Sequence, residues 1–312
     1  MPVYTFTVSD LSHPVRVDSY LSSQLKEYSR SQIQQQIKNN QMAINQKTIT
    51  KARTLVVNHD ETRIVIDLLP EPSWEAQKKN LDIVFEDEAM LVINKSAGDV
   101  VHPGSGNPDE TILNGLIHHD PELAKLPRAG IIHRLDKDTT GLMIIAKQPE
   151  SFQVLTDQLA KRAIHRHYEA IVHGRLESNG SVDQPIGRHP TKRIQMTVRP
   201  DGKTAKTYYD VLACFDRHSH IKCRLVTGRT HQIRVHMRHI KHPLVGDPVY
   251  HGGYHSSQPN QTKWQALVQQ LNRQALHARH LALEHPITKE PIAFESPLPK
   301  DMSNILDYLR ST

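Results

Sequence analysis

The stretch "IIHRLDKDTTGLMIIAK", residues 131–147, places a densely charged loop between two apolar runs. Short apolar runs bounded by turn residues are typical of buried strands. Arg134 and Lys137 flank Asp136, and neighbouring cations keep a carboxylate ionised even where burial would neutralise it. An ionised, partly desolvated carboxylate can act as a nucleophile or a base. From this loop alone, a solvated turn built on Asp138 is the simpler interpretation.

The composition indicates a chain with a sizeable core and a mild excess of positive charge. The 312 residues are 37% hydrophobic and carry 39 Lys and Arg against 33 Asp and Glu. That length allows one large or two smaller domains. Two cysteines are too few for a disulfide framework or a four-thiolate zinc site. With no secretory pattern at the N-terminus and no membrane-spanning apolar run, we expect a soluble cytoplasmic protein with no membrane partner.

Residues 15–70 have the pattern of a small α+β module. Val17, Leu21 and Leu25 recur four apart, as on one face of a short helix. Ser29 is placed to cap a second helix, and strand patterns follow around residues 42–44 and 62–69.

This module carries a run of positive charge. Between Ser29 and Arg53 there are five basic residues and no acidic one. A solvated helix normally mixes both signs, so a one-signed run favours a face that binds nucleic-acid phosphates. The alternative is a basic surface without a partner. The five residues are Arg30, Lys38, Lys47, Lys51 and Arg53.

We predict a linker at residues 71–80, because the stretch 70–80 has two prolines and is otherwise mostly polar or charged, and one long domain over residues 81–312. In that domain strand patterns outnumber helical ones and do not alternate regularly with them. This favours an α+β fold on a mixed, mostly antiparallel sheet. Strands are expected at 81–87, 89–95, 130–136, 141–147, 167–174, 206–215 and 219–228, and helices at 110–119, 151–164 and 231–240.

Residues 227–250 form a second basic segment. Arg229 precedes the expected helix in a "TGRT" turn and is placed to pair with an acid elsewhere. Four histidines in the segment have no nearby cysteine or matched carboxylates, so we predict no metal site. A basic helix packed by Ile233, Met237 and Ile240 is the plainer alternative.

A third basic segment, residues 188–206, resembles a hairpin with an Asp-Gly turn. Its charge suits a phosphate backbone, although edge strands also carry lysine for other reasons. The candidate RNA contacts here are Arg188, Lys192 and Arg193.

Taken in order, several motifs resemble those of RNA pseudouridine synthases of the large-ribosomal-subunit type. They are "LDIVFEDEAMLVINKSAGDVVHPGSGN", "HRLDKDTTGL", "HRHYEAIVHG", "GKTAKTYYDVL", "TGRTHQIRVHMRHIKHPLVGDPVY" and "RQALHARHLALEHPITKEPIAF". The resemblance covers nearly all of residues 81–305. The 15–70 module resembles the S4-like RNA-binding domain that commonly precedes this catalytic domain. The motifs therefore imply an S4-like α+β domain followed by a pseudouridine synthase domain.

The resemblance also implies roles for single residues. Asp136 matches the family's catalytic aspartate, and Arg229 matches the arginine that pairs with it. Tyr168 matches the tyrosine that stacks on the target base, and Ile233 an apolar wall of the pocket. Arg134 matches a side chain that fills the space left when the uridine flips out.

The reaction implied is the isomerisation of uridine, which involves no redox change and so no cofactor. The implied partner is 23S rRNA, or the assembling large ribosomal subunit, with the helix 69 stem-loop as target and a monomer as the working form. Two alternatives stay open: the same chemistry on another rRNA or tRNA uridine, and a non-catalytic RNA-binding factor in ribosome assembly.

Overall fold

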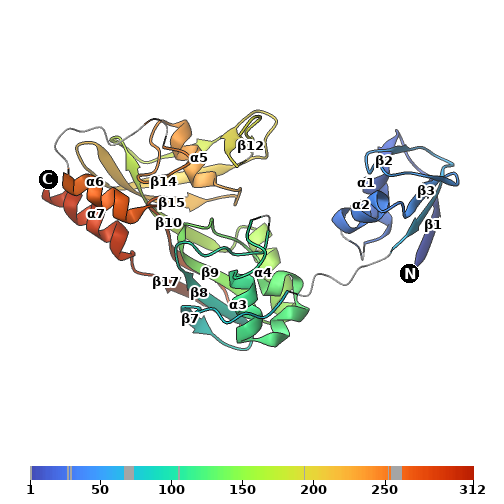
Figure 1. The fold of residues 1–312 in the computed structure, drawn as a ribbon, viewed down its shortest axis with the longest axis horizontal. Coiled ribbons are helices and arrows are strands. Elements are labelled where there is room, and N and C mark those ends of the chain that lie inside the picture. The colour runs from blue at the N-terminus through green and yellow to red at the C-terminus, as the bar shows by residue number, and fades with distance from the viewer. Residues whose placement is uncertain are drawn as a thin grey trace. The chain divides into compact units, whose positions relative to one another are not determined.

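A computed structural model describes residues 2–26, 28, 30–66, 74–104, 106–192, 194–251, 253 and 262–312. The chain divides into two compact units, Met1–Ser73 and Trp74–Thr312 (Figure 1). No helix among the described residues combines the length and apolar character needed to cross a membrane.

The first unit packs two short helices against a four-stranded antiparallel sheet. Helix α1 is Val17–Gln24 and α2 is Arg30–Lys38. The sheet order is β1-β6-β3-β4, with β1 Val3–Thr7, β3 Met42–Ile44, β4 Lys47–Thr48 and β6 Glu61–Val65. A second strand pair joins β2 Val15–Arg16 to β5 Leu55–Val56.

The core of this unit follows the predicted helical periodicity. Val17, Leu21 and Leu25 are buried, as are Ile33 and Ile37 of α2. Strand β1 begins before the predicted start of the module because it pairs along the full length of β6. The predicted strand at 62–69 ends at residue 65, and its residues 67–69 lie outside the described part of the chain, as does the predicted cap, Ser29.

The second unit is built on one large sheet with the order β11-β14-β15-β10-β16-β9-β8-β7, and β17 pairs with β16. All neighbours are antiparallel except β16 and β9, which run parallel. This confirms the predicted mixed, mostly antiparallel sheet. The strands are β7 Ile83–Glu86, β8 Met90–Lys95, β9 Thr140–Ala146, β10 His165–His173, β11 Gly180–Asp183, β14 Lys206–Cys214, β15 His218–Leu225, β16 Leu276–Glu284 and β17 Pro291–Glu295.

The remaining elements of this unit cover or extend the sheet. The helices are α3 Ile112–His119, α4 Pro149–Ala160, α5 Gln232–His239, α6 Thr262–Leu271 and α7 Lys300–Ser311, with 3-10 turns at Pro121–Lys125 and Pro127–Gly130. A separate hairpin joins β12 Ile186–Arg188 to β13 Met196–Val198.

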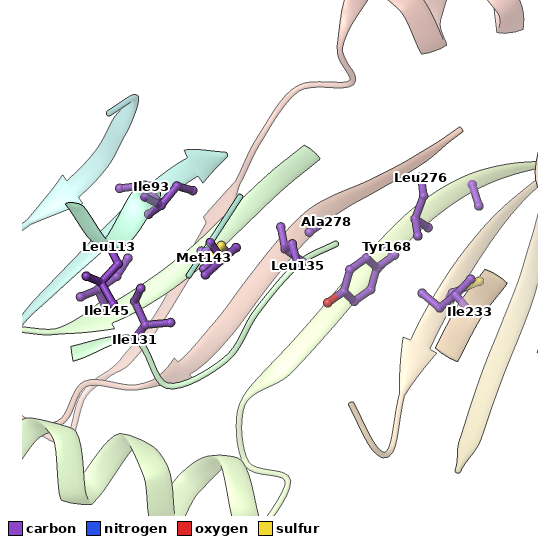
Figure 2. Close-up of a cluster of buried hydrophobic side chains, with 14 of the residues drawn as sticks. Ile93, Leu113, Ile131, Leu135, Met143, Ile145, Tyr168, Ile233, Leu276 and Ala278 are labelled. Atoms are coloured by element: carbon purple, nitrogen blue, oxygen red, sulfur yellow. The ribbon is translucent and has the colours of Figure 1, made fainter. Parts of the chain in front are cut away.

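Strands β8 and β9 are buried on both faces. Met90 and Val92 pack with Leu155 of α4 on one side, while Leu91 and Ile93 join the larger core cluster on the other (Figure 2). Burying one such side chain contributes roughly 1.5–3 kcal/mol. The paired strands therefore form a rigid centre, and the loop that precedes β9 is anchored to it.

Four sequence predictions about this unit are wrong in detail. Residues 130–136 are not a strand, because Ile131 makes a single bridge to Ile145 and the chain then leaves the sheet. The helix predicted at 151–164 ends at Ala160, and Ala163 beyond it is exposed. The β12–β13 hairpin turns within residues 189–195, and the Asp-Gly pair follows β13 instead.

The fourth concerns the linker. Residues 74–80 belong to the second unit, which therefore begins before residue 81. Trp74 packs against its core, the backbone N of Gln77 donates to Asn114 O (3.1 Å), and Lys79 pairs with Asp99 (2.7 Å).

The junction of β9 with β16 makes a prediction for acid stability. His277 is buried there, its Nδ1 accepting from Thr140 Oγ1 (2.8 Å) and its Nε2 donating to Ser296 O (3.3 Å). Burial lowers its pKa from 6.5 to about 4. Between these values the unfolded chain binds the extra proton, so stability falls as pH falls, by up to about 1.4 kcal/mol per pH unit.

His277→Gln should remove this contribution and flatten the pH dependence of the unfolding free energy by up to one proton. Denaturant unfolding from pH 7 to 4.5 measures the slope for both proteins. Equal slopes would show that His277 is not a source of the acid sensitivity.

Candidate active site

Asp136 lies in a loop whose backbone is fixed on several sides. Thr139 N donates to Asp136 O (3.1 Å), which closes a turn at residues 137–138. Lys137 O accepts from the buried ammonium of Lys95 (2.6 Å) and from Gly98 N (3.1 Å). Asp138 is therefore a turn residue, as the sequence indicated, and the carboxylate of Asp136 projects from an ordered backbone.

Glycine is required where this loop enters β9. Gly141 has a φ of +113°, and a Cβ there would overlap the backbone of Ala278 in the parallel strand β16. Only glycine combines that conformation with so close an approach.

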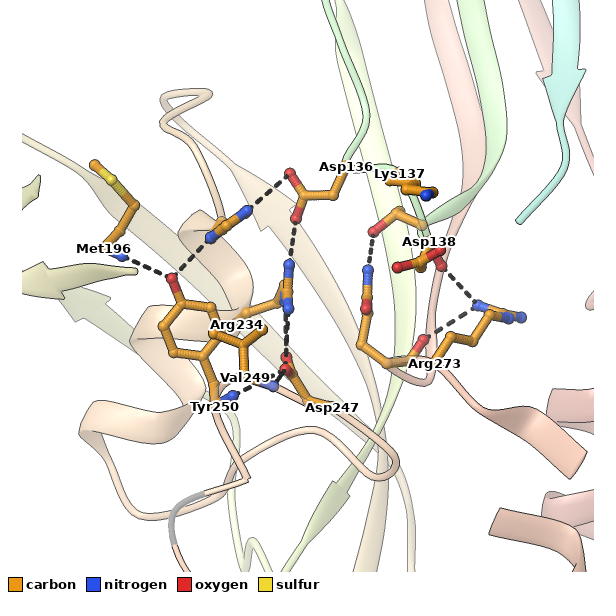
Figure 3. A network of polar contacts seen from close by, with 12 residues as sticks. Asp136, Lys137, Asp138, Met196, Arg234, Asp247, Val249, Tyr250 and Arg273 are labelled. Atoms are coloured by element: carbon orange, nitrogen blue, oxygen red, sulfur yellow. Dashed lines mark hydrogen bonds and ion pairs between the residues drawn. The ribbon is translucent and has the colours of Figure 1, made fainter. Parts of the chain in front are cut away.

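The carboxylate of Asp136 is paired with Arg234 of α5. Arg234 Nη1 donates to Asp136 Oδ2 (3.1 Å), and the same guanidinium donates through Nε and Nη2 to both oxygens of Asp247 (2.7 and 2.9 Å) (Figure 3). The side chain of Arg234 is 6% exposed and that of Asp247 is 0% exposed. One buried guanidinium thus bridges two carboxylates, and Asp136 is the one that reaches the pocket.

Electrostatics keep this cation charged. Burial alone would lower the pKa of Arg234, but the hydrogen bonds and charge of Asp247, together with the charge of Asp136, outweigh it and raise that pKa. A charged Arg234 makes charge-assisted hydrogen bonds to both of its carboxylate partners.

Asp247 is in turn held by the backbone of its own loop. Its Oδ1 accepts from Val249 N and Tyr250 N, both at 2.9 Å. The ring of Tyr250 lies 4.9 Å from the Arg234 guanidinium, and its hydroxyl contacts His231 Nδ1 (2.7 Å) and accepts from Met196 N (2.8 Å) (Figure 3). This network fixes the position of Arg234 and, through it, that of the Asp136 carboxylate.

His231 approaches the other oxygen of Asp136. Its Nε2 lies 3.9 Å from Asp136 Oδ1. Burial lowers the pKa of His231, and the charge of Asp136 opposes that shift only in part. His231 therefore adds a nearby ring without the strong ion pair that Arg234 makes.

Arg229 does not pair with Asp136, which corrects the expectation from sequence. Its Nε donates to Thr204 O (3.1 Å), and its backbone N donates to Gln232 Oε1 (3.0 Å). Arg229 precedes α5, where its side chain turns toward the 204–207 segment. Arg234 lies inside the helix and faces the loop.

A pocket of about 240 Å³ opens beside Asp136. Tyr168 of β10 and Ile233 of α5 line it, and Figure 2 shows the Tyr168 ring in the buried cluster near Leu276 and Ile233. Burial raises the pKa of Tyr168. Arg134 lines the same pocket and is exposed. The structure therefore brings together Asp136, Tyr168, Arg229, Arg134 and Ile233, all of which were candidates from sequence.

The other candidate RNA-binding residues lie elsewhere. Arg188 lines a second hollow, which shares Gly228 and Arg229 with the wall of the first, and Lys192 is exposed in the hairpin turn. Arg193 lies outside the described residues.

In the first unit, Lys38 and Lys51 are exposed, as an RNA-binding face requires. Arg30 donates to the buried carboxylate of Asp18 (3.0 Å), which Arg16 also contacts. The charge of Arg30 is therefore partly neutralised by an ion pair within the unit.

The arrangement can supply an ionised carboxylate, an aromatic ring and an apolar wall to a planar ring of uracil size. Among the described residues, no group of three His, Cys, Asp or Glu side chains is placed to hold a metal ion. Sequence reasoning had missed Arg234 as the partner of Asp136, and also Asp247. One signal was present: Asp247 is the only acidic residue within 227–250. A single acidic residue in an otherwise basic segment suggests that it forms a buried ion pair with one of the arginines of that segment.

Arg234→Met should destabilise the second unit by about 3–5 kcal/mol, because it leaves the buried carboxylate of Asp247 without a partner. Arg229→Met should cost about 1 kcal/mol, the loss of one hydrogen bond to a carbonyl. Denaturant unfolding measures both. Adding Asp247→Asn to Arg234→Met should recover part of the loss. Equal costs for the two arginines would contradict the pairing described above.

Comparisons with known proteins agree with the geometry. Residues 89–239 match the family model described as RNA pseudouridylate synthase, and residues 15–61 match that of the S4 domain. The chain is 46% identical over 308 residues to ribosomal large subunit pseudouridine synthase D of Vibrio parahaemolyticus, covering 99% of this chain and 95% of that protein. It is 44% identical over 307 residues to the protein of that name in Escherichia coli strain K12, covering 98% and 94%.

Solved structures agree on the fold. Human RNA pseudouridylate synthase domain containing 4 matches with a TM-score of 0.56 and 25% identity, covering 73% of this chain and 92% of that one. Human RNA pseudouridylate synthase domain containing 1 matches with a TM-score of 0.53 and 24% identity, covering 75% and 96%.

Proposed function

The chain is an RNA pseudouridine synthase, an isomerase with an N-terminal S4 domain, and we propose that its substrate is the 23S rRNA of the large ribosomal subunit. The observation that carries this proposal is the similarity to ribosomal large subunit pseudouridine synthase D over nearly the full length of both chains. The basic residues of both units suit a polyanionic partner of this kind.

Within that rRNA we propose the helix 69 stem-loop as the target. Enzymes that act on a base in nucleic acid extrude it from the stack, which costs least where the base is already unpaired. Sequence-specific RNA recognition also favours loops with splayed bases. We propose that the protein acts on this loop as a monomer in the cytoplasm, with either naked rRNA or the assembling subunit as its substrate.

Asp136 is the proposed catalyst. Isomerisation breaks the N1–C1′ bond of uridine and joins C1′ to C5; C5 loses a proton and N1 gains one, so no electrons enter or leave. The carboxylate can attack C1′, add to C6 or abstract the 2′ proton. Each route needs it ionised and aimed, and the ion pair with Arg234 at 3.1 Å supports both requirements.

The pocket residues take the remaining roles. We assign Tyr168 to stack on the flipped base and Ile233 to the apolar wall beside it, which fits their place in the lining. Arg134, exposed at the same pocket, is assigned to fill the space that the uridine leaves in the RNA.

Flanking RNA is the proposed ligand of the basic residues outside the pocket. Contacts to phosphates fix the register of a protein on its nucleic acid and carry little sequence information. In the second unit these are Arg188, Lys192 and Arg193, and in the first they are Arg30, Lys38 and Lys51.

Asp136→Asn and Asp136→Ala should abolish pseudouridine formation, because neither side chain can act as the ionised catalyst. Conversion of an rRNA fragment containing helix 69 is the measurement, with binding of the same fragment as a control that both variants should pass. Full isomerisation by either variant would remove Asp136 from the mechanism and favour a different catalyst.

Pseudouridine mapping of ribosomal RNA with and without the gene tests the substrate. Loss of pseudouridine from helix 69 is expected. If helix 69 keeps its pseudouridines while another rRNA or a tRNA loses one, the chemistry stands and the target is wrong. If no site changes, a non-catalytic role in assembly is favoured.

Lys192→Ala should weaken RNA binding uniformly across sequences, because an exposed lysine in the hairpin turn meets phosphates rather than bases. Each lost phosphate contact lowers the slope of log affinity against log salt by about 1. Affinities measured from 50 to 200 mM salt give that slope. An unchanged slope would exclude Lys192 from the interface.

A further inference from the structure

Arg166 is a pocket residue that the proposed mechanism does not use. Along β10, Arg166 and Tyr168 face the same side of the sheet, and both line the pocket beside Asp136. His167, between them, faces the other side, where its ring stacks on that of His280 at 5.0 Å. Two residues of a strand span about 7 Å. Arg166 therefore lies next to Tyr168, whose ring is proposed to stack on the flipped base.

The charge of Arg166 has no partner among the described residues. Its Nε is buried and has no hydrogen-bond acceptor, and none of the ion pairs in the described part of the chain includes it. The neighbouring arginines differ, since Arg229 donates to Thr204 O and Arg234 to two carboxylates. A partly buried cation without an acceptor is costly, so its retention in a binding pocket points to an anion that arrives with the ligand.

A second donor without an acceptor lies on the same pocket. His133 is buried, and its Nε2 accepts from Ile144 N (3.2 Å), which leaves the proton on Nδ1. That Nδ1 has no partner among the described residues either. Burial and the charge of Arg166 lower the pKa of His133 to about 3, so the ring is a neutral donor.

No second carboxylate in the pocket lining competes for Arg166. Asp136 is the single carboxylate among the lining residues, and it is bonded to Arg234. On the other side, a Cβ on Gly228 would lie 3.5 Å from Arg166 Nη1, so the guanidinium reaches the 227–230 turn that forms the pocket wall.

We propose that Arg166 binds a backbone phosphate next to the target uridine. The planar guanidinium fork matches two phosphate oxygens. A uracil carbonyl is neutral and would leave the cation uncompensated. This contact rests on the proposed RNA substrate and adds to it a positioning residue, which fixes where the sugar of the flipped nucleotide sits relative to Asp136.

The test combines protein and RNA changes. Helix 69 stem-loops with one convertible uridine are made with a neutral methylphosphonate in place of the phosphate on its 5′ or its 3′ side. Wild-type conversion of the unmodified RNA checks the proposed substrate separately. Arg166→Met removes the charge, and Arg166→Lys keeps the charge without the fork. Arg224→Met is the matched control, because Arg224 pairs in register with His167, on the face of the sheet away from the pocket.

On unmodified RNA, Arg166→Met should lose about ten- to a hundredfold in kcat/KM, the size of a charge-assisted hydrogen bond. Arg166→Lys should lose less, and Arg224→Met should match wild type. One of the two methylphosphonates should lower kcat/KM of the wild type by a similar factor. The same substitution should cause no further loss in Arg166→Met. Arg166→Met should also unfold at or above the wild-type temperature, because it removes an unpaired, partly buried cation.

The proposal would be overturned if each methylphosphonate lowered kcat/KM by the same factor in Arg166→Met as in wild type. The phosphates would then act independently of Arg166. A lower unfolding temperature for Arg166→Met, with kcat/KM restored at a temperature where the variant is fully folded, would overturn it in favour of a structural role. If wild type fails to convert the unmodified stem-loop, the proposed target is wrong. The same phosphate test then moves to the RNA that mapping identifies.

Discussion

The ion pair between Asp136 and Arg234 is the contact on which the rest of the site depends. A reactive carboxylate has to point at one place, and a buried guanidinium gives it a charged hydrogen-bond donor in a fixed position. Arg234 can do so only because Asp247 holds its other edge and the amides of residues 249 and 250 hold Asp247. The backbone of residues 249 and 250 thus fixes Asp247, Asp247 fixes Arg234, and Arg234 fixes the orientation of the Asp136 carboxylate.

The sheet fixes the other end of this arrangement. Strands β8 and β9 are buried on both faces. In the loop that precedes β9, successive residues are hydrogen-bonded to side chains from elsewhere in the unit. Lys95 binds Lys137 O, and Gln274 Nε2 donates to Thr139 Oγ1 (2.9 Å). Arg273, paired with Asp301 of α7, reaches Asp138 O (3.4 Å). The Asp136 backbone therefore has little freedom, as a preorganised reactive group requires.

Local patterns in the sequence predicted most of the fold, whereas the assignment of Asp136 came from the resemblance of the ordered motifs to a family. Helical spacing located α1, α4 and α5, and apolar runs located β8 and β9, because these signals are carried by neighbouring residues. Side-chain pairing depends on the tertiary fold, so the sequence could not distinguish Arg229 from Arg234 as the partner of Asp136. The acceptor of Arg229, Thr204, and the second acceptor of Arg234, Asp247, both come from other segments.

The most direct test of this account is the single-turnover rate of pseudouridine formation with lysine at each arginine in turn. Lysine keeps the charge but lacks the planar fork that holds both oxygens of Asp247 while reaching Asp136. A misplacement of about 1 Å can cost about a hundredfold in rate. We predict a loss of that order for Arg234→Lys and a much smaller one for Arg229→Lys. A large loss for Arg229→Lys with little change for Arg234→Lys would contradict the claim that Arg234 orients Asp136, the proposed catalyst.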